Sequence, residues 1–431
     1  MTAFDRFDLV DARVSAALEE LGAATRPDYI NDVLQVTAAR RQRPRWTFLE
    51  RLLPMDTTMR RPIGLRGVPP GLLIALVFLL IAMIGAALFV GSRQTLAPFG
   101  PAANGKVLYV ANGDLYIRDG LEAQGKLVVS LPGDQFAPTW SPTGEWFAFI
   151  STTSDGDQVF VARADGSDVH QVAPIPPTGN AQAAWRPDGL AIAFIYDVKG
   201  FPKLSMAFVD GSPTQVIDLG YDAPRELAWR PPNGGELLLG VIKPGAKVDY
   251  ITIRPDGTGR RDFNLPSEQL MGTNWNNPGA AYSPDGSRIA YNQVTPGGDR
   301  RSGPFQIHVM NADGTGDVAL PRTDVSVSDS WPVFSPDGRW ILVNRYRPGE
   351  DPRRAWLAVM PSDGSAPARD IGPKFKADNE IQLAKSWSPD GTRVQVFQGE
   401  DYGAVSIDPE TGNYEVLDWA TDLPDIQRTI R

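Results

Sequence analysis

A short turn motif that recurs six times is the feature that most restricts the fold of this chain. It reads WSPTG from Trp140, WRPDG from Trp185, WRPPNG from Trp229, YSPDG from Tyr282, FSPDG from Phe334 and WSPDG from Trp387. The aromatic residues that open it are 45, 44, 53, 52 and 53 residues apart. Periods of roughly 40–50 residues with one aromatic residue and one turn per repeat are typical of propeller blades. The period therefore predicts a β-propeller.

The residues around each motif predict four strands per repeat. Within the motif, Pro presets φ at the second turn position, Asp caps the turn, and Gly accepts a positive φ. The residues that follow alternate between apolar and polar, as in EWFAFIS and SRIAYNQ, which indicates a strand. A second turn, Asp-Gly, is a strong hairpin signal. It occurs at Asp165, Asp210, Asp256, Asp313 and Asp363. Each repeat is therefore predicted to form one four-stranded antiparallel blade.

The number of blades depends on the two ends of the repeat region. Before the first motif, GKVLYVANGDLYIRDG and KLVVS supply three strands but no aromatic inner strand. After the last motif, RVQVFQG, AVSIDPETG and YEVLDW supply the outer strands of one more blade. The tail DLPDIQRTI is able to supply the missing inner strand and so to close the ring. We predict seven blades over residues 104–431, and a six-bladed ring is the alternative.

The repeat resembles that of the TolB-like propellers, whose blades carry the same aromatic-Ser-Pro-Asp-Gly turn and a following Asp-Gly-Ser/Thr hairpin. The resemblance covers roughly residues 104–431. It implies that a C-terminal segment completes the first blade; Pro424, Gln427 and Arg428 match that segment, whereas Ile426 stands in place of its aromatic residue. The resemblance implies a fold and a habit of recognition, and it does not imply a reaction.

An apolar stretch in front of the repeats predicts a membrane span. Residues 71–91 read GLLIALVFLLIAMIGAALFVG, and about 20 such residues cross a bilayer as a helix. Eight arginines lie between Arg40 and Arg66, whereas few basic residues follow the span, so the positive-inside rule places the N-terminus in the cytoplasm. We therefore expect a basic linker at 56–70, a second linker at 92–103, and a cell-membrane protein whose propeller is extracytoplasmic.

The basic run before the span predicts contact with the lipid surface. The sequence ARRQRPRW contains Arg40, Arg41, Arg43 and Arg45 on the cytoplasmic side, where each arginine contributes on the order of 1 kcal/mol of attraction to an anionic leaflet. Residues 1–70 hold 11 arginines and 9 acidic residues. That balance is too even for a nucleic-acid footprint, so we expect the bilayer, and no nucleic acid, as the partner of this run.

Residues 1–55 are predicted to form a small helical cytoplasmic domain. FDLVDARVSAALEEL places apolar residues at helical spacing, and TRPDYINDVLQVTAAR begins with capping-box spacing. A short helical domain, a basic linker, one span and a large outer domain resemble the layout of membrane-anchored anti-sigma factors. Because residues 1–70 contain neither His nor Cys, the resemblance implies the type without zinc. It also implies a cytoplasmic regulator, a sigma factor, as a partner.

The residue types exclude several kinds of chemistry. The chain has no cysteine and only two histidines, so thiolate chemistry and multi-histidine metal sites are excluded. A G-x-S-x-G elbow, which a propeller-bearing hydrolase of the α/β type needs, does not occur. His170 is predicted to lie at the surface of an outer strand, and His308 to be a packed or edge histidine within a strand. We therefore expect no catalytic residues, no cofactor and no metal, and a chain that is not an enzyme.

The longer connections of the blades predict a binding face. The motif turns and the Asp-Gly turns fall at one rim of a propeller, so the insertions that lengthen the later repeats fall at the other. The candidate contact residues in those insertions are Trp275, Asn276, Arg300, Arg301, Arg353 and Arg354. The tryptophan alternatively wedges between blades, and the arginines alternatively are only solvated. The expected ligand is a protein or peptide outside the membrane.

Three functions remain open from the sequence. The first is a binding or sensing module that signals to a cytoplasmic partner. The second is an envelope scaffold with no signalling role. The third is a hydrolase that acts through the propeller face.

Overall fold

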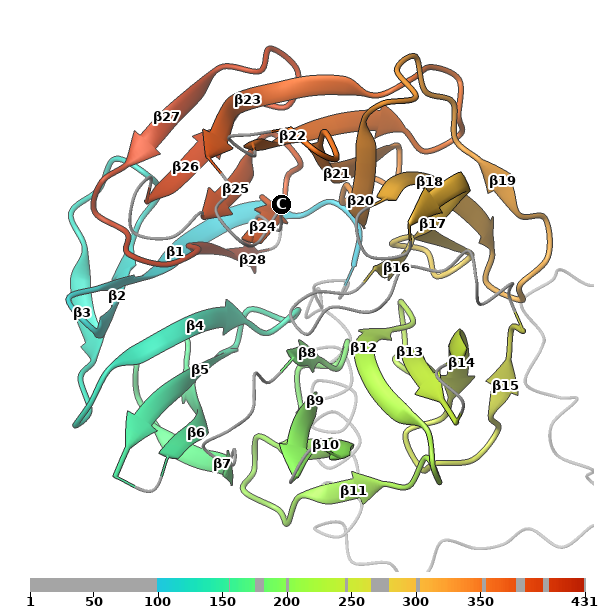
Figure 1. Ribbon diagram of the computed structural model, residues 1–431. Coiled ribbons are helices and arrows are strands. Elements are labelled where there is room, and N and C mark those ends of the chain that lie inside the picture. The colour runs from blue at the N-terminus through green and yellow to red at the C-terminus, as the bar shows by residue number, and fades with distance from the viewer. Residues whose placement is uncertain are drawn as a thin grey trace, which may run out of the picture. The chain divides into compact units, whose positions relative to one another are not determined.

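The computed structural model describes residues 99–154, 156–174, 182–198, 201–244, 247–264, 279–299, 303–350, 354–376, 384–397 and 403–429. These residues form seven four-stranded antiparallel sheets, arranged as the blades of a ring (Figure 1). The prediction of seven blades is confirmed, and the six-bladed alternative is wrong. No helix capable of crossing a bilayer occurs in this part of the chain. The predictions for 1–55, 56–70 and 71–91 lie outside the described residues.

The blades follow one another along the chain (Figure 1). Blades 2 to 7 each start with their inner strand, whereas the inner strand of blade 1 comes from the C-terminal end of the described residues. Blade 1 contains β28 (Asp425–Thr429), β1 (Ala103–Ala111), β2 (Asp114–Arg118) and β3 (Lys126–Val129). Blade 2 contains β4 (Gln135–Trp140), β5 (Trp146–Thr153), β6 (Gly156–Arg163) and β7 (His170–Pro174). Blade 3 contains β8 (Gln182–Trp185), β9 (Ala191–Val198), β10 (Phe201–Phe208) and β11 (Gln215–Ile217). Blade 4 contains β12 (Ala223–Trp229), β13 (Leu237–Lys243), β14 (Lys247–Ile253) and β15 (Arg261–Asp262).

The last three blades keep the same plan. Blade 5 contains β16 (Ala280–Tyr282), β17 (Arg288–Asp299), β18 (Gly303–Asn311) and β19 (Val318–Ala319). Blade 6 contains β20 (Ser328–Phe334), β21 (Trp340–Tyr346), β22 (Arg354–Pro361) and β23 (Arg369–Lys376). Blade 7 contains β24 (Ala384–Trp387), β25 (Val394–Phe397), β26 (Ala404–Ile407) and β27 (Tyr414–Leu417). The hydrophobic core lies between blades, because most buried clusters draw residues from two neighbouring sheets.

Local hydrogen bonds explain why the repeated motif forms a tight turn. In blade 5, the Ser283 hydroxyl accepts from the backbone N–H of Arg288 at 2.9 Å and donates to Asp285 at 2.5 Å. The Asp285 carboxylate also accepts from the backbone N–H of Ser287 at 3.0 Å. Gly286 has φ +68°, and a Cβ placed there would lie 2.0 Å from the carbonyl oxygen of Pro231 in blade 4. Glycine is therefore required both by the turn and by the approach of the neighbouring blade.

Three of the motif tryptophans tie their blade to the one before it. The indole N–H of Trp229 in blade 4 donates to the carbonyl of Ala184 in blade 3 at 3.0 Å. Trp185 and Trp387 make the equivalent bonds to the preceding blades, at 3.3 and 3.4 Å. In contrast, the indole N–H of Trp140 has no hydrogen-bond acceptor among the described residues. The aromatic residue of the repeat thus supplies both buried area and a hydrogen bond between blades.

Because Trp229 makes this hydrogen bond and Trp140 does not, substituting each by phenylalanine measures what the bond contributes to stability. Trp229→Phe is expected to lower the free energy of unfolding by about 1 kcal/mol more than Trp140→Phe, because only the first removes a hydrogen bond. The two side chains are equally buried, at 4% and 5% exposed, so the loss of apolar area is similar. Urea denaturation followed by far-ultraviolet circular dichroism measures both. Equal losses would show that the bond between blades contributes nothing to stability.

The C-terminal tail closes the ring, as the sequence predicted. Strand β28 pairs with β1, with Ile426 opposite Val107, and Ile426 is 7% exposed. The carboxylate of Asp425 accepts from the backbone N–H of Trp140 in blade 2 at 2.7 Å. The side-chain amide of Gln427 donates to the carbonyl of Gly144, also in blade 2, at 2.7 Å. An isoleucine therefore replaces the aromatic residue at closure, and the polar neighbours of Ile426 hold blade 1 to blade 2.

Candidate functional site

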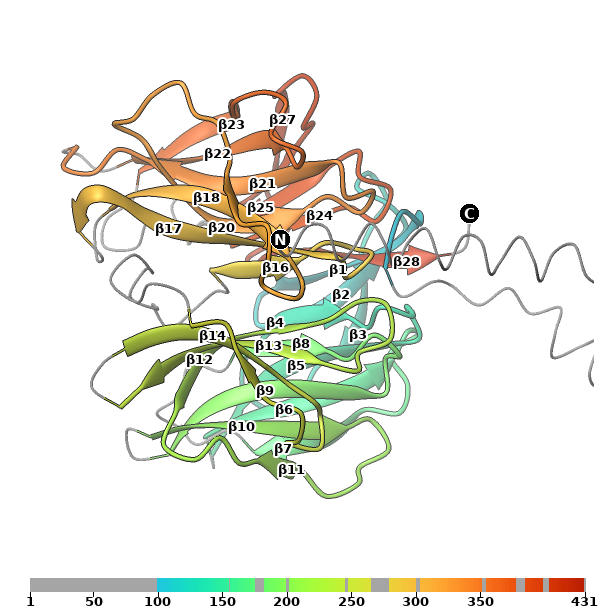
Figure 2. The ribbon, with the colours of Figure 1, turned by 90° about the vertical axis from the view of Figure 1, so that its right-hand side faces the viewer.

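The ring has two faces, which differ in the connections that lie on them. Each chain reversal through the motif or through an Asp-Gly turn lies on one face, which we call the turn face, and the other connections lie on the loop face. Figure 2 shows the ring from its edge, with the end of β17 at the loop face on the left and the end of β28 at the turn face on the right. The backbone N–H of Ala102 donates to the carbonyl of Pro389 at 2.9 Å. The first described residues of the chain therefore lie at the turn face.

The contact residues were predicted from the sequence to lie on the loop face. Trp275, Asn276, Arg300, Arg301 and Arg353 lie outside the described residues, so their grouping stays a prediction. Arg354 is described: it begins β22, is exposed, and lies opposite Lys376 of β23. Like charges directly opposite each other in a sheet repel.

Both histidines contact groups of the blades around them. His170 lies on the outer strand of blade 2, with Nε2 2.8 Å from the carbonyl oxygen of Val209 in blade 3. His308 lies in β18, with Nδ1 3.1 Å from the Asp317 carboxylate and its ring 5.6 Å from the ring of Tyr291. The outer-strand position of His170 and the packed position of His308 agree with the sequence. The described residues contain no group of three or more His, Asp or Glu able to hold a metal ion.

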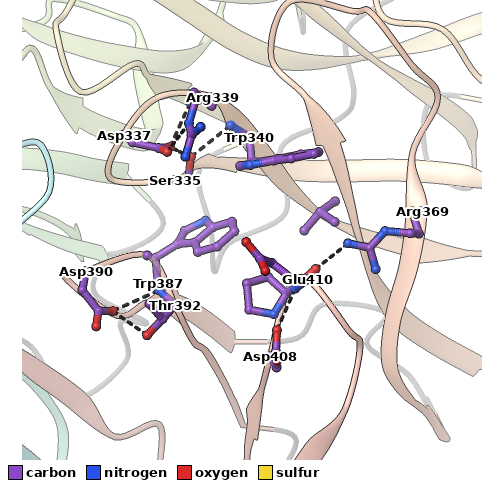
Figure 3. Close-up of a pocket in the computed structure, with 13 residues that line it drawn as sticks. Ser335, Asp337, Arg339, Trp340, Arg369, Trp387, Asp390, Thr392, Asp408 and Glu410 are labelled. Atoms are coloured by element: carbon purple, nitrogen blue, oxygen red, sulfur yellow. Dashed lines mark hydrogen bonds and ion pairs between the residues drawn. The ribbon is translucent and has the colours of Figure 1, made fainter.

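A cleft of about 330 Å³ opens on the turn face between blades 6 and 7 (Figure 3). We call it the 6–7 cleft. Blade 6 contributes Asp337, Trp340 and Arg369, and blade 7 contributes Trp387, Asp390 and Glu410 to its walls. Its walls come from five segments of the chain, at residues 335–340, 359, 369, 387–392 and 408–410.

Two indoles give the 6–7 cleft its apolar surface. Trp340 begins β21, and its backbone N–H donates to the Ser335 hydroxyl at 3.0 Å, which fixes its position beside the motif turn. Its side chain is 39% exposed, which is unusual for tryptophan. Trp387 ends β24 and is half-buried. Figure 3 shows Trp340, Trp387 and Glu410 around the same opening.

Three of the four carboxylates in the 6–7 cleft accept hydrogen bonds from described residues, and the fourth, Glu410, does not. Asp337 pairs with Arg339 at 2.5 Å, and Arg369 donates to the carbonyl of Pro409 at 2.5 Å. Backbone N–H groups of Glu410 and Thr411 donate to Asp408 and hold the pKa of that carboxyl below its ordinary value.

Asp390 is held in a similar way. Burial acts to raise its pKa, but hydrogen bonds from Thr392 and Ser388 outweigh burial and keep the pKa below the ordinary value. The Glu410 side chain is exposed, and no described residue donates a hydrogen bond to it. Four carboxylates and two guanidinium groups line the cleft, which gives a formal charge of −2.

At the 6–7 interface a tryptophan stands where blade 5 has an arginine that bridges to its neighbour. Between blades 4 and 5, Arg230 donates to the carbonyl of Gly286 at 3.0 Å. Between blades 5 and 6, Arg288 donates to the carbonyl of Ser362 at 2.9 Å. The position of Arg288, two residues after the glycine of the motif, is occupied in blade 6 by Trp340. The Arg288-type bridge is therefore absent between blades 6 and 7, and an arginine from another strand, Arg369, joins these blades through the carbonyl of Pro409.

A longer turn in blade 7 completes the cleft. In blade 2 the Asp-Gly turn is closed by a hydrogen bond from the N–H of Arg163 to the carbonyl of Ser167. In blade 7 the corresponding bond runs from Asp408 to Asn413, so this turn is one residue longer. The sequence DPETG there replaces Asp-Gly, and it brings Pro409 and Glu410 into the cleft wall.

The sequence analysis did not find this site, because it looked for ligand contacts in the long loops of the opposite face. Two signals were nevertheless present. A tryptophan follows FSPDGR where the preceding repeat has an arginine, and DPETG interrupts the series of Asp-Gly turns.

By its topology the chain is a seven-bladed β-propeller. Solved structures agree with this class. A crystal structure of prolyl endopeptidases matches with a TM-score of 0.53 and 15% identity over 78% of this chain and 51% of that chain. The tricorn protease matches with a TM-score of 0.52 and 13% identity over 78% of this chain and 35% of that chain. At these identities the likeness shows the fold alone.

The particular relative suggested by the motif is also among the matches. TolB from Acinetobacter baumannii matches with a TM-score of 0.41 and 19% identity, over 60% of this chain and 62% of that chain. This chain thus spans less than two thirds of the length of each of these three proteins. No protein-family model matches the sequence, and no curated protein is similar enough to match. The comparisons with TM-scores above 0.5 support the propeller fold.

Proposed function

We propose that this chain is a membrane-anchored, extracytoplasmic propeller that binds a protein or peptide ligand. The observation that carries the proposal is the 6–7 cleft, in which the indole of Trp340 is 39% exposed beside an uncommitted carboxylate. Exposed tryptophan in a concave site is typical of binding surfaces. The proposed anchor is residues 71–91, and the proposed role is binding and not catalysis.

We further propose that residues 1–55 hold a cytoplasmic partner, a sigma factor, and that Arg40, Arg41, Arg43 and Arg45 contact the inner leaflet. The layout of the sequence supports this part. The alternatives are an envelope scaffold without signalling and a hydrolase that acts through the propeller face. Full-length chain extracted from membranes at near-physiological salt should retain a sigma factor that is lost when 1–55 are deleted; retention of none favours the scaffold.

Photo-crosslinking in intact cells tests the binding function. A chain carrying p-benzoylphenylalanine in place of Trp340 is expected to form a discrete adduct with one protein or peptide. Tyr221 is the matched control position, because it is 94% exposed and lies after β11 in the connection to blade 4, away from the cleft. The readout is the mass of the adduct. The proposal fails if position 340 gives no adduct, or the same adducts as position 221.

A further inference from the structure

We infer that the 6–7 cleft binds a cationic side chain, lysine or arginine, presented by the peptide ligand. The inference rests on the proposed binding function and names the chemistry of its ligand. Three observations support it: the exposed indole of Trp340, the Glu410 carboxylate to which no described residue donates, and the small volume of the cleft.

The molecule itself shows what an indole at this position binds. Trp146 of blade 2 occupies the same place as Trp340 of blade 6, two residues after the glycine of the motif. The guanidinium of Arg163 lies 4.2 Å from the centre of the Trp146 ring, and Trp146 is only 6% exposed. In blade 6 the residue opposite Trp340 is Pro361, as Arg163 is opposite Trp146. The cation that covers the indole in blade 2 is thus missing in blade 6.

Two other tryptophans of the propeller also carry a cation over the ring. Arg118 lies 4.0 Å from the ring of Trp419, and Lys374 lies 4.2 Å from the ring of Trp356. Among the described residues, no cation is found over the ring of Trp340. A cation above an indole face is attracted by the ring quadrupole. At three other tryptophans a cation of the chain itself lies over the indole. At Trp340 a lysine or arginine of the ligand would make the same cation–π contact.

The charges of the cleft favour the same ligand. Its lining carries a formal charge of −2, and the other carboxylates are already hydrogen-bonded, so Glu410 is the one free to pair with an incoming cation. Arg369 is engaged with Pro409 and does not neutralise Glu410. A volume of about 330 Å³ lies at the small end of ligand pockets, which suits one side chain and its adjoining backbone.

The test uses the full-length chain in nanodiscs, labelled with 5-fluorotryptophan. The fluorine signal of Trp340 is assigned as the one lost in Trp340→Phe among the 11 tryptophans. The probes are acetyl-Ala-Lys-Ala-amide, acetyl-Ala-Gln-Ala-amide and maltotriose. We expect the lysine peptide to shift the Trp340 signal saturably, the other two to leave it in place, and the affinity to fall as salt is raised.

Two variants separate the carboxylate of the cleft from general charge. Glu410→Gln is expected to weaken the lysine peptide about fivefold, because it removes the partner of the cation. Glu145→Gln removes one exposed charge from the same face, in the motif turn of blade 2, and is expected to change nothing. Both side chains are exposed, so neither substitution threatens the fold.

The outcomes distinguish this inference from the proposed function. A shift of Trp340 by the glutamine peptide or by maltotriose equal to that of the lysine peptide overturns the cationic ligand. So does an affinity that Glu410→Gln leaves unchanged, or no response to the lysine peptide at all. If a crosslink at position 340 is obtained in cells in any of these cases, the binding function stands and only the ligand class is wrong.

Discussion

A chain that ends at Thr421 is expected to lose the cooperative fold of the propeller. The deletion removes β28, so β1 loses its hydrogen-bonded neighbour and blade 1 loses its inner strand. It also removes the buried Ile426 and the two carboxylates, Asp422 and Asp425, that accept hydrogen bonds from the backbone N–H groups of Ala137 and Trp140. Native domains are stable by about 5–15 kcal/mol, and the loss of a whole inner strand is of that order.

Near-ultraviolet circular dichroism and differential scanning calorimetry measure this loss. The expected result is a weak near-ultraviolet signal and no sharp calorimetric transition. A truncated chain that still melts in one sharp transition near the temperature of the full chain would show that the ring does not need its closing strand.

Asp425→Asn is the control that keeps the strand and changes only one charge. Asp425 is buried, and burial raises its pKa to about 6, although hydrogen bonds from Trp140, Thr139 and Ile426 oppose this. The folded state therefore holds a proton that the unfolded state has released above its ordinary pKa near 3.8. The stability contributed by this group is complete below about pH 4 and is lost as the pH rises to about 6. Asp425→Asn should stay folded and lack this fall in stability.

The fold was predictable because its main signals are local. The hydrogen bonds among Ser283, Asp285 and Arg288 lie within six residues, so the letters of the motif determine its geometry. The closing strand was harder to predict, because Ile426 does not match the aromatic pattern. What places it is a contact between Asp425 and Trp140, residues 285 positions apart, and no pattern in the sequence reports such a contact.

The candidate site was not predictable for a related reason. The sequence shows that Trp340 replaces the arginine of the preceding repeat. It does not show that a cleft lies between Trp340 and the next blade. Glu410 lies 70 residues further along the chain, and only the ring geometry brings the two to one cleft. The long insertions suggested a site on the other face, because insertions are visible in a sequence whereas the contacts between neighbouring blades are not.

Arg345→Met is expected to lower the free energy of unfolding by about 3–5 kcal/mol, because it strips a buried carboxylate of its counter-charge. Arg345 makes two parallel bonds to Asp329, at 2.7 and 2.8 Å, and a third to Asp370 at 2.8 Å. The side chains of Arg345 and Asp329 are 9% and 4% exposed. Burial acts to lower the pKa of Arg345, but the two carboxylates outweigh it and raise that pKa above its ordinary value.

A double variant shows where this energy comes from. Asp329→Asn combined with Arg345→Met is expected to be more stable than Arg345→Met alone, since no buried charge is then left unpaired. Asp370→Asn should cost under about 1 kcal/mol, because Asp370 is 49% exposed. Urea denaturation of the four chains measures all three differences. If the double variant is no more stable than Arg345→Met, the lost free energy of unfolding comes from the packing of the arginine and not from the unpaired carboxylate of Asp329.

The same variants separate blade stability from ligand binding. Arg345 joins β20, β21 and β23, and β21 and β23 begin with Trp340 and Arg369 of the 6–7 cleft. The double variant, once folded, keeps both cleft residues. The lysine peptide should therefore shift its Trp340 fluorine signal with the affinity of the unsubstituted chain. A weakened response in that variant would mean that the charge network of blade 6 positions the indole as well as stabilising the sheet.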